Sequence, residues 1–189
     1  KFKNLEVHAI DRLTPFLSEL GIIKFDESLP LDLKANSRVK NTVQATSIIL
    51  FPESRRNEKI WPFFEELANW ILKEYNFNVF IAGNHKDNRF SACQDLRGNI
   101  ALGNLPEVVS NASLIICNDS APLHIASALR KKMIALFGPT EPIKYGPYPI
   151  DHQNNIIIRS PTRRIDEIQI GDVKSAIKCL LSDNTNTTD

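Results

Sequence analysis

A regular alternation of short apolar runs with longer amphipathic segments, starting at Thr46, constrains the fold more than any other feature of the sequence. The strand-like runs are residues 46–51, 78–83, 113–118, 133–138 and 154–160, and the helix-like segments are 61–75, 105–112, 121–132 and 170–181. Strands that are apolar almost throughout are typical of a parallel sheet covered on both faces. We therefore expect an α/β fold, a Rossmann-like doubly wound parallel sheet with helices as crossover connections.

Two shorter segments and the two ends of the chain complete the prediction. "KDNRFSACQDL" (86–96) predicts a further helix, and "NIAL" (99–102) a short strand. Residues 7–20 have apolar residues at helical spacing before Gly21, although Pro15 interrupts the pattern. We therefore divide the chain into an interdomain helix and connector (1–45), a nucleotide-sugar-binding domain (46–182) and a polar, disordered tail (183–189).

Charge and composition exclude several classes of function. With 23 Lys and Arg against 22 Asp and Glu, the net charge of +1 provides no global field for nucleic-acid binding. No apolar run reaches the roughly 18 residues that span a bilayer, so we expect at most peripheral membrane contact. The three cysteines, Cys93, Cys117 and Cys179, are odd in number and lack metal-ligand spacing. We expect reduced thiols in the cytoplasm, no metal and no cofactor.

Ligands of doubly wound sheets bind where strands end, so the residues after each apolar run are the first candidates. The loop after 46–51 holds Ser54, Arg55, Arg56 and Lys59 just before a helix. Cations and hydroxyls beside a helix N-terminus suit a phosphate, because the free N–H groups there already favour negative charge. A solvated, charged turn is the alternative, since no glycine-rich phosphate motif is present.

The next two strands are followed by acidic residues. Asp87, after 78–83, is placed to accept hydrogen bonds from ribose hydroxyls, or to cap a helix. Asp119 and Ser120, after 113–118, open a helix that carries Pro122 in its first turn and His124 one turn in. This start is either a phosphate-facing helix terminus or an ordinary capped helix. A serine hydrolase is a poor fit, because "NDSAP" lacks the glycines of a nucleophile elbow.

Several motifs, in order along the chain, resemble glycosyltransferase family 9, the ADP-heptose:lipopolysaccharide heptosyltransferases. The family pattern N-D-S-G-P-x-H-x-A-x-A-L, a strand and F-G-P-T-x-P is matched by "NDSAPLHIASAL" and "FGPTEP". "EKIWPFFEELANWI" is similar to the K-x-W-P helix start, and "LRGNIALGNLPEVVSNASLIICNDS" to the segment before the main motif. "VHAIDRLTPFLSELGI" looks like the interdomain segment.

The resemblance implies a GT-B glycosyltransferase, two Rossmann-like domains facing a cleft, of which this chain is the C-terminal, donor-binding half. Since the chain starts at Lys1 without an initiator methionine, we expect it to be part of a longer protein. The implied partners are a nucleoside-diphosphate sugar, a lipopolysaccharide core or other glycan acceptor, and the missing N-terminal domain that carries the catalytic base. The implied location is the cytoplasm, with the cytoplasmic face of the inner membrane as the narrower alternative.

The resemblance also implies a role for each candidate residue. Lys59 would contact the diphosphate and offset the charge of the leaving group, with Ser54 and Arg55 in the same loop. Asp87 would hold the ribose and Ile100 would flank the base. The phosphates and donor sugar would meet the start of the 121–132 helix, through the residues Asp119, Ser120, Ala121 and His124.

The sequence departs from the family pattern at a few positions. Ala121 and Glu53 replace glycines, and Asn84 and His85 replace a frequent Gly-Pro. Glu53, Ala121 and the missing half leave open a non-catalytic module that binds nucleotide sugars. A sugar-nucleotide epimerase of the GT-B fold is a further alternative, which shares the architecture but not this set of motifs.

Overall fold

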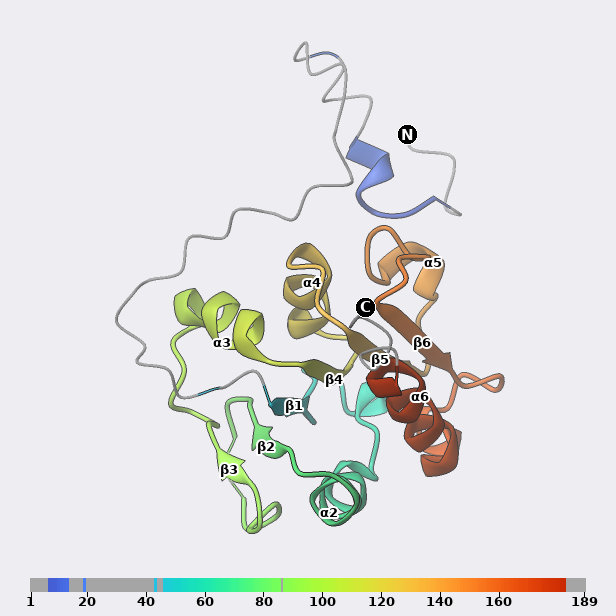
Figure 1. Ribbon diagram of the computed structural model, residues 1–189. Helices are drawn as coiled ribbons and strands as arrows, with labels where there is room; N and C mark the ends of the chain where they lie inside the picture. The colour runs from blue at the N-terminus through green and yellow to red at the C-terminus, as the bar shows by residue number, and fades with distance from the viewer. Residues whose placement is uncertain (1–6, 14–18, 20–42, 44–45, 86, 183–189) are drawn as a thin grey trace, which may run out of the picture.

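The computed structural model describes residues 7–13, 19, 43, 46–85 and 87–182 (Figure 1). Its centre is a six-stranded parallel sheet in the order β3-β2-β1-β4-β5-β6. The strands are β1 (Ser47–Phe51), β2 (Asn78–Ile81), β3 (Gln94–Asp95), β4 (Leu114–Asn118), β5 (Met133–Phe137) and β6 (Asn155–Arg159). This order characterises dinucleotide-binding Rossmann folds, with the switch in direction between β1 and β4.

Helices cover both faces of the sheet, as Figure 1 shows. One face carries α2 (Phe64–Glu74) and α6 (Ile170–Ser182), and the other carries α3 (Leu105–Asn111) and α4 (Ala121–Ala128). A short helix, α5 (Pro142–Tyr145), follows β5. The described chain also contains four 3-10 helices: η1 (Asp11–Leu13), η2 (Asn57–Lys59), η3 (Leu102–Asn104) and η4 (Ile165–Glu167).

The apolar strands form two separate cores because successive side chains point to opposite faces. Ile48 and Leu50 of β1 belong to the core under α2 and α6, whereas Ile49 and Phe51 belong to the core under α3 and α4. All four side chains are buried. This double burial explains why the strands are apolar at every position, and it confirms the predicted Rossmann-like, doubly wound fold.

The segment between β2 and α3 differs from the prediction. Residues 86–96 do not form a helix: the described residues make turns and then β3. Asp87 and Asp95 each accept a hydrogen bond from the backbone N–H two residues later, and such side-chain bonds compete with helix formation. The predicted strand at 99–102 is also wrong, because η3 follows there and the edge strand is β3.

The ends of the chain are described only in part. Within the predicted helix 7–20, the described residues contain the single turn η1. The rest of that helix apart from residue 19, most of the connector to residue 45 and the tail 183–189 lie outside the described residues, so the domain boundaries stay predictions. Cys93, Cys117 and Cys179 are free thiols, as expected. In the part of the chain that is described, no helix has the length and apolar character needed to cross a membrane.

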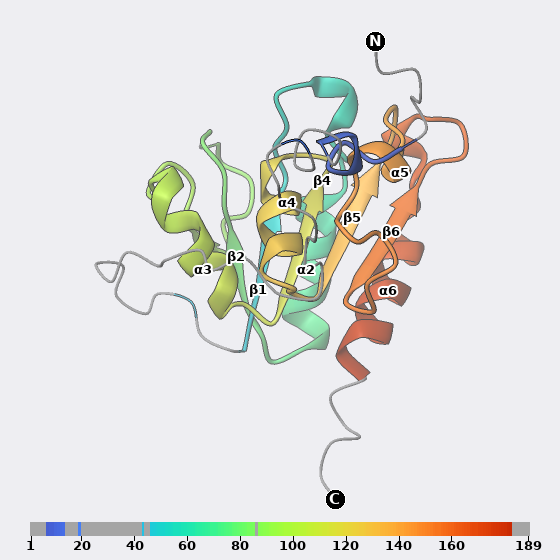
Figure 2. The same cartoon turned by 90° about the horizontal axis from the view of Figure 1, so that it is seen from above.

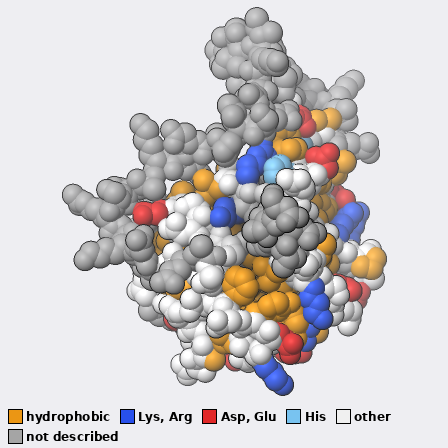
Figure 3. All heavy atoms as spheres, viewed as in Figure 1, with side chains coloured by type: hydrophobic (Ala, Val, Ile, Leu, Met, Phe, Trp, Pro, Cys, Tyr) orange, Lys and Arg blue, Asp and Glu red, His pale blue; other side chains and the backbone are white. Residues whose placement is uncertain are grey.

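Figure 2 shows the carboxyl ends of the strands at the upper edge of the sheet, where η2 and α5 also lie. Figure 3 shows the opposite edge, with basic and acidic side chains scattered among hydrophobic ones. The loops that carry most of the candidate residues thus share one edge of the sheet.

Candidate functional site

Three loops meet at the carboxylate of Asp119. Lys59, at the end of η2 after β1, places its Nζ 2.5 Å from Oδ2 of Asp119, which follows β4. The hydroxyl of Thr140, in the loop after β5, donates a hydrogen bond to the same Oδ2, also at 2.5 Å. The three strands are neighbours and parallel, so their carboxyl ends bring these loops together. The side chains of Lys59 and Asp119 are only 14% and 7% exposed, and this shielding strengthens their ion pair.

Asn118, the last residue of β4, fixes the position of the Lys59 loop. Its side-chain Oδ1 accepts the backbone N–H of Trp61 at 3.1 Å, and its Nδ2 donates to the carbonyl of Pro52 at 3.0 Å. Trp61 is buried and donates its indole N–H to the carbonyl of Ile168 at 2.9 Å. The loop that carries Lys59 is therefore held at both ends.

Helix α4 begins beside this ion pair. Ser120 precedes it in extended conformation and makes no side-chain capping bond to the helix, because its hydroxyl donates to the carbonyl of Asn118 at 3.3 Å. Ala121 is the first helical residue and is exposed. The first N–H groups of a helix lack intrahelical carbonyl partners and carry its positive dipole end. The start of α4 thus offers an anion an open N–H group next to the ammonium of Lys59.

His124 lies one turn into α4 and interacts electrostatically with the ion pair of Lys59 and Asp119. Partial loss of solvent around the ring lowers the pKa of His124, although the side chain stays exposed; the carboxylate of Asp119 opposes this shift, and His8 and Lys59 add to it. His124 therefore lies within electrostatic range of Lys59 and Asp119, on an exposed part of α4.

Asp87 belongs to a separate cluster after β2. Its Oδ1 accepts from the guanidinium of Arg97 at 2.8 Å, and its Oδ2 accepts from that of Arg89 at 2.8 Å. These hydrogen bonds, first from Arg89 and then from Arg97, hold the pKa of Asp87 well below its usual range. Arg97 itself is buried and also binds Asp95, whose hydrogen bond raises the pKa of the guanidinium. Asp87 is thus a fixed carboxylate at the surface rather than a helix cap.

The remaining candidates lie along the same loops. Ser54 is half-buried and Arg55 is exposed in the loop after β1, and Ile100 is half-buried against the core under α3 and α4. Glu53 turns its carboxylate toward the loop after β2, where it accepts the backbone N–H groups of Asn84 and His85 at 2.8 and 2.7 Å. The charge of Glu53 is therefore engaged by these two N–H groups.

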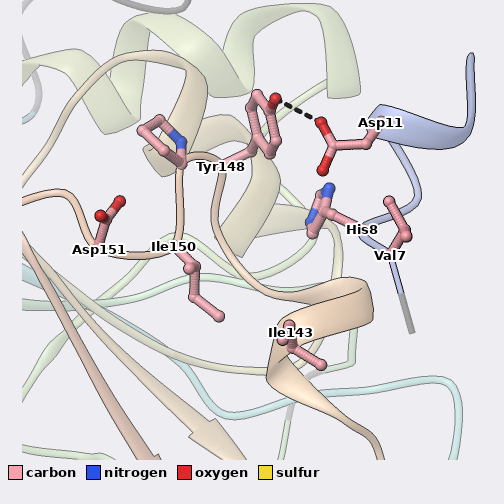
Figure 4. Close-up of a pocket in the computed structure, with 8 residues that line it drawn as sticks. Val7, His8, Asp11, Ile143, Tyr148, Ile150 and Asp151 are labelled. Atoms are coloured by element: carbon pink, nitrogen blue, oxygen red, sulfur yellow. Dashed lines mark hydrogen bonds between the residues drawn. The ribbon is translucent and has the colours of Figure 1, made fainter. Parts of the chain in front are cut away.

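A cavity of about 470 Å³ lies elsewhere, between the N-terminal segment and the residues around α5 (Figure 4). Its lining includes His8, Asp11 and Tyr148. Tyr148 donates to Asp11 at 2.6 Å, and His8 pairs with the carbonyl of Gly146 at 3.2 Å. The polar side chains of its wall thus form hydrogen bonds between the N-terminal segment and the residues after α5. None of the predicted site residues lines this cavity.

Sequence reasoning missed three residues that organise the site: Asn118, Thr140 and Arg97. Asn118 and Thr140 stand inside the quoted motifs; Asn118 ends β4 directly before Asp119, and Thr140 lies in the loop three residues after β5. A place in a motif that follows an apolar strand was the available signal for these two. Arg97 gave no signal, because its role depends on a turn that was predicted as a helix.

Comparison with known proteins supports the motif assignment. Residues 4–174 match the family described as glycosyltransferase family 9 (heptosyltransferase). The lipooligosaccharide heptosyltransferase 2 of Haemophilus ducreyi is 31% identical over 144 residues, which cover 67% of this chain and 40% of that enzyme. The chain belongs to glycosyltransferase family 9, the family that the motifs predicted.

Solved structures agree on the fold. A glycosyltransferase family 9 protein from Veillonella parvula superposes with a TM-score of 0.74 at 21% identity, covering 94% of this chain and 60% of that one. The Escherichia coli heptosyltransferase WaaC with ADP gives a TM-score of 0.62 at 19% identity, covering 74% and 45% of the two chains. The chain is thus one Rossmann-like half of a GT-B glycosyltransferase fold. The chain spans 32% of the lipooligosaccharide heptosyltransferase 2 of Haemophilus influenzae and 40% of the same enzyme of Haemophilus ducreyi, well under half of each.

Proposed function

We propose that this chain is the donor-binding half of a glycosyltransferase that moves heptose, or a related sugar, from ADP-heptose to a lipopolysaccharide core acceptor with inversion. The observation that carries the proposal is the ammonium of Lys59 beside the start of α4, on the shared edge of the sheet. Membership of family 9 and the relatives' names, heptosyltransferases of lipopolysaccharide and lipooligosaccharide, support the reaction class.

The proposed roles follow from position. Lys59 and the free N–H group of α4 receive the diphosphate, with Ser120, Ala121 and His124 around it. Ser54 and Arg55 border the same loop. Farther along the edge, Asp87 accepts from the ribose hydroxyls and Ile100 flanks the base. Asp119 holds Lys59 and faces the donor sugar.

In the proposed transfer, an acceptor hydroxyl oxygen forms a bond to the anomeric carbon while the bond from that carbon to the diphosphate oxygen breaks. The bonding electron pair leaves with ADP, and the hydroxyl proton goes to a base in the N-terminal GT-B domain, outside this chain. Lys59 and the dipole of α4 stabilise the negative charge that develops on the leaving diphosphate. Fixed donors of this kind are worth roughly 3 kcal/mol each in comparable sites.

The test is calorimetric titration of the chain and of Lys59→Ala with ADP-heptose, ADP and adenosine. A hydrogen bond to a charged group contributes about 1.5–3 kcal/mol, so ADP should bind Lys59→Ala roughly ten- to a hundredfold more weakly. Adenosine should bind both proteins alike, because it has no phosphate. Lys73→Ala, which removes an exposed cation from α2, is the matched control and should bind like the wild type.

Equal losses for ADP and adenosine would mean that Lys59 does not face the phosphates. No binding of any nucleoside diphosphate or its sugar conjugates, even with an N-terminal half restored, would reject the proposal itself.

A non-catalytic module that binds nucleotide sugars is the second candidate, and Glu53 and Ala121 are the observations that favour it. Turnover of ADP-heptose by a protein that includes the upstream domain would exclude it. Product analysis of that reaction would also separate a transferase from an epimerase, since only the transferase releases ADP and lengthens the acceptor.

A further inference from the structure

The carboxylate of Asp119 receives two donors on one oxygen. The ammonium of Lys59 and the hydroxyl of Thr140 both lie 2.5 Å from Oδ2. The backbone of Asp119 is fixed as well, because its N–H donates to the carbonyl of Leu136 in β5 at 3.1 Å. The orientation of this carboxylate thus depends on a hydroxyl from the loop after β5.

The loop that carries Thr140 is itself closely held. It runs from Gly138 to α5, with Pro139 and Pro142 on either side of Thr140, and proline rings restrict the backbone. At Gly138 an added Cβ would lie 2.7 Å from Cβ of Ile165, so the backbone passes close against η4. Glu141, the next residue, is paired with the guanidinium of Arg159 at 2.6 Å. The hydroxyl of Thr140 is therefore presented from a constrained backbone.

We infer that Thr140 is a positioning residue of the donor site: its hydrogen bond to Asp119 fixes the carboxylate that in turn holds the ammonium of Lys59 beside the start of α4. This inference rests on the proposed function, since it assigns Thr140 a part in binding the diphosphate. Thr140 acts through Asp119.

The physical basis is preorganisation. A lysine side chain has many rotamers, and ordering it when the ligand arrives costs free energy that a prior contact avoids. Asp119 provides that contact, and a carboxylate held by one donor instead of two can rotate about its side-chain torsion. Without the hydroxyl of Thr140, Lys59 would sample orientations that point away from the diphosphate. The loss should appear in the binding of phosphates and not in the binding of the nucleoside.

The experiment compares Thr140→Val, which removes the hydroxyl at similar volume, with Thr140→Ser, which keeps it. ADP and adenosine are titrated into the whole chain by calorimetry. Thr140→Val should bind ADP roughly five- to tenfold more weakly, a smaller loss than in Lys59→Ala, because Thr140 acts on the diphosphate only through Asp119 and Lys59. Its affinity for adenosine should be unchanged, and Thr140→Ser should restore ADP binding to near the wild-type value.

Thr46→Val is the matched control, because Thr46 is exposed at the opposite end of the sheet, just before β1. It should bind both ligands like the wild type. If Thr140→Val does not fold, Thr140→Ala provides the same comparison.

Two results would overturn the inference while leaving the proposed function intact. One is wild-type ADP affinity in Thr140→Val when Lys59→Ala loses ADP selectively. The other is an equal loss of ADP and adenosine, which would show a purely structural role. If no nucleoside diphosphate binds the wild-type chain, even with an N-terminal half restored, the proposed function and the inference are rejected together.

Discussion

Asn118 shows how one buried amide can set the geometry of a site that it does not enter. Each of its two side-chain polar atoms makes a hydrogen bond, Oδ1 with the N–H of Trp61 and Nδ2 with the carbonyl of Pro52. The residue is fully buried, so water cannot replace either bond. The loop between those two partners carries Lys59, and its position therefore depends on Asn118.

We predict that Asn118→Leu is destabilised by about 2–6 kcal/mol, because two buried backbone groups each lose a partner at about 1–3 kcal/mol. For a chain of this size the midpoint of thermal unfolding should fall by roughly 5–20 °C. Circular dichroism on heating measures this. Asn69→Leu, at an exposed position in α2, is the control and should unfold close to the wild type. Equal midpoints for the two variants would show that the amide bonds of Asn118 contribute little.

At the scale of elements, the loops after β1 and β2 are connected through Glu53 and Gly83. Gly83 has a φ of +155°, a conformation that residues with a Cβ rarely adopt. A Cβ there would lie 2.6 Å from the carboxylate carbon of Glu53. The oxygens of this carboxylate accept the backbone N–H groups of the two residues after Gly83, Asn84 and His85. The glycine therefore permits the close approach of the two loops.

We predict that Gly83→Ala is destabilised by about 1–3 kcal/mol through backbone strain and displacement of Glu53. Urea unfolding should show a lower midpoint with an unchanged slope. The matched variant is Gly103→Ala, where an added Cβ meets nothing within 4 Å. It should be neutral or slightly stabilising, since alanine reduces the entropy of the unfolded chain. A Gly83→Ala variant as stable as Gly103→Ala would contradict this account of the loop contact.

The elements themselves were largely predictable from the sequence where the hydrophobic pattern is strong. The runs that became β1, β4 and β5 are apolar at nearly every position, and burial on two faces leaves little ambiguity in such a pattern. The two wrong predictions, a helix at 86–96 and a strand at 99–102, both fall in a region where the sequence is mostly polar. There the structure is decided by side-chain bonds from Asp87 and Asp95 and by the buried Arg97, which no periodicity reveals.

At the scale of the whole molecule, the site was predictable in part for a topological reason. Candidate residues at the ends of neighbouring parallel strands had to meet, and Lys59 and Asp119 do. Their exact pairing, and the place of Thr140 in it, depends on loop conformations. The position of the site does not identify its ligand, because the same edge of this fold binds many kinds of ligand in different proteins.

The site joins loops that follow three neighbouring strands, β1, β4 and β5, so a ligand bound there should stabilise the whole domain against unfolding. We predict that ADP at about 100 times its dissociation constant adds about 2.7 kcal/mol, which raises the midpoint of thermal unfolding by roughly 5–10 °C. Tryptophan fluorescence reports this, because Trp61 is buried beside Lys59 and follows it by two positions. Adenosine at the same concentration should give a smaller shift, since it lacks the contacts to Lys59 and α4. In Lys59→Ala the shift with ADP should fall toward that with adenosine, and a shift with ADP that survives unchanged in this variant would place the diphosphate away from Lys59.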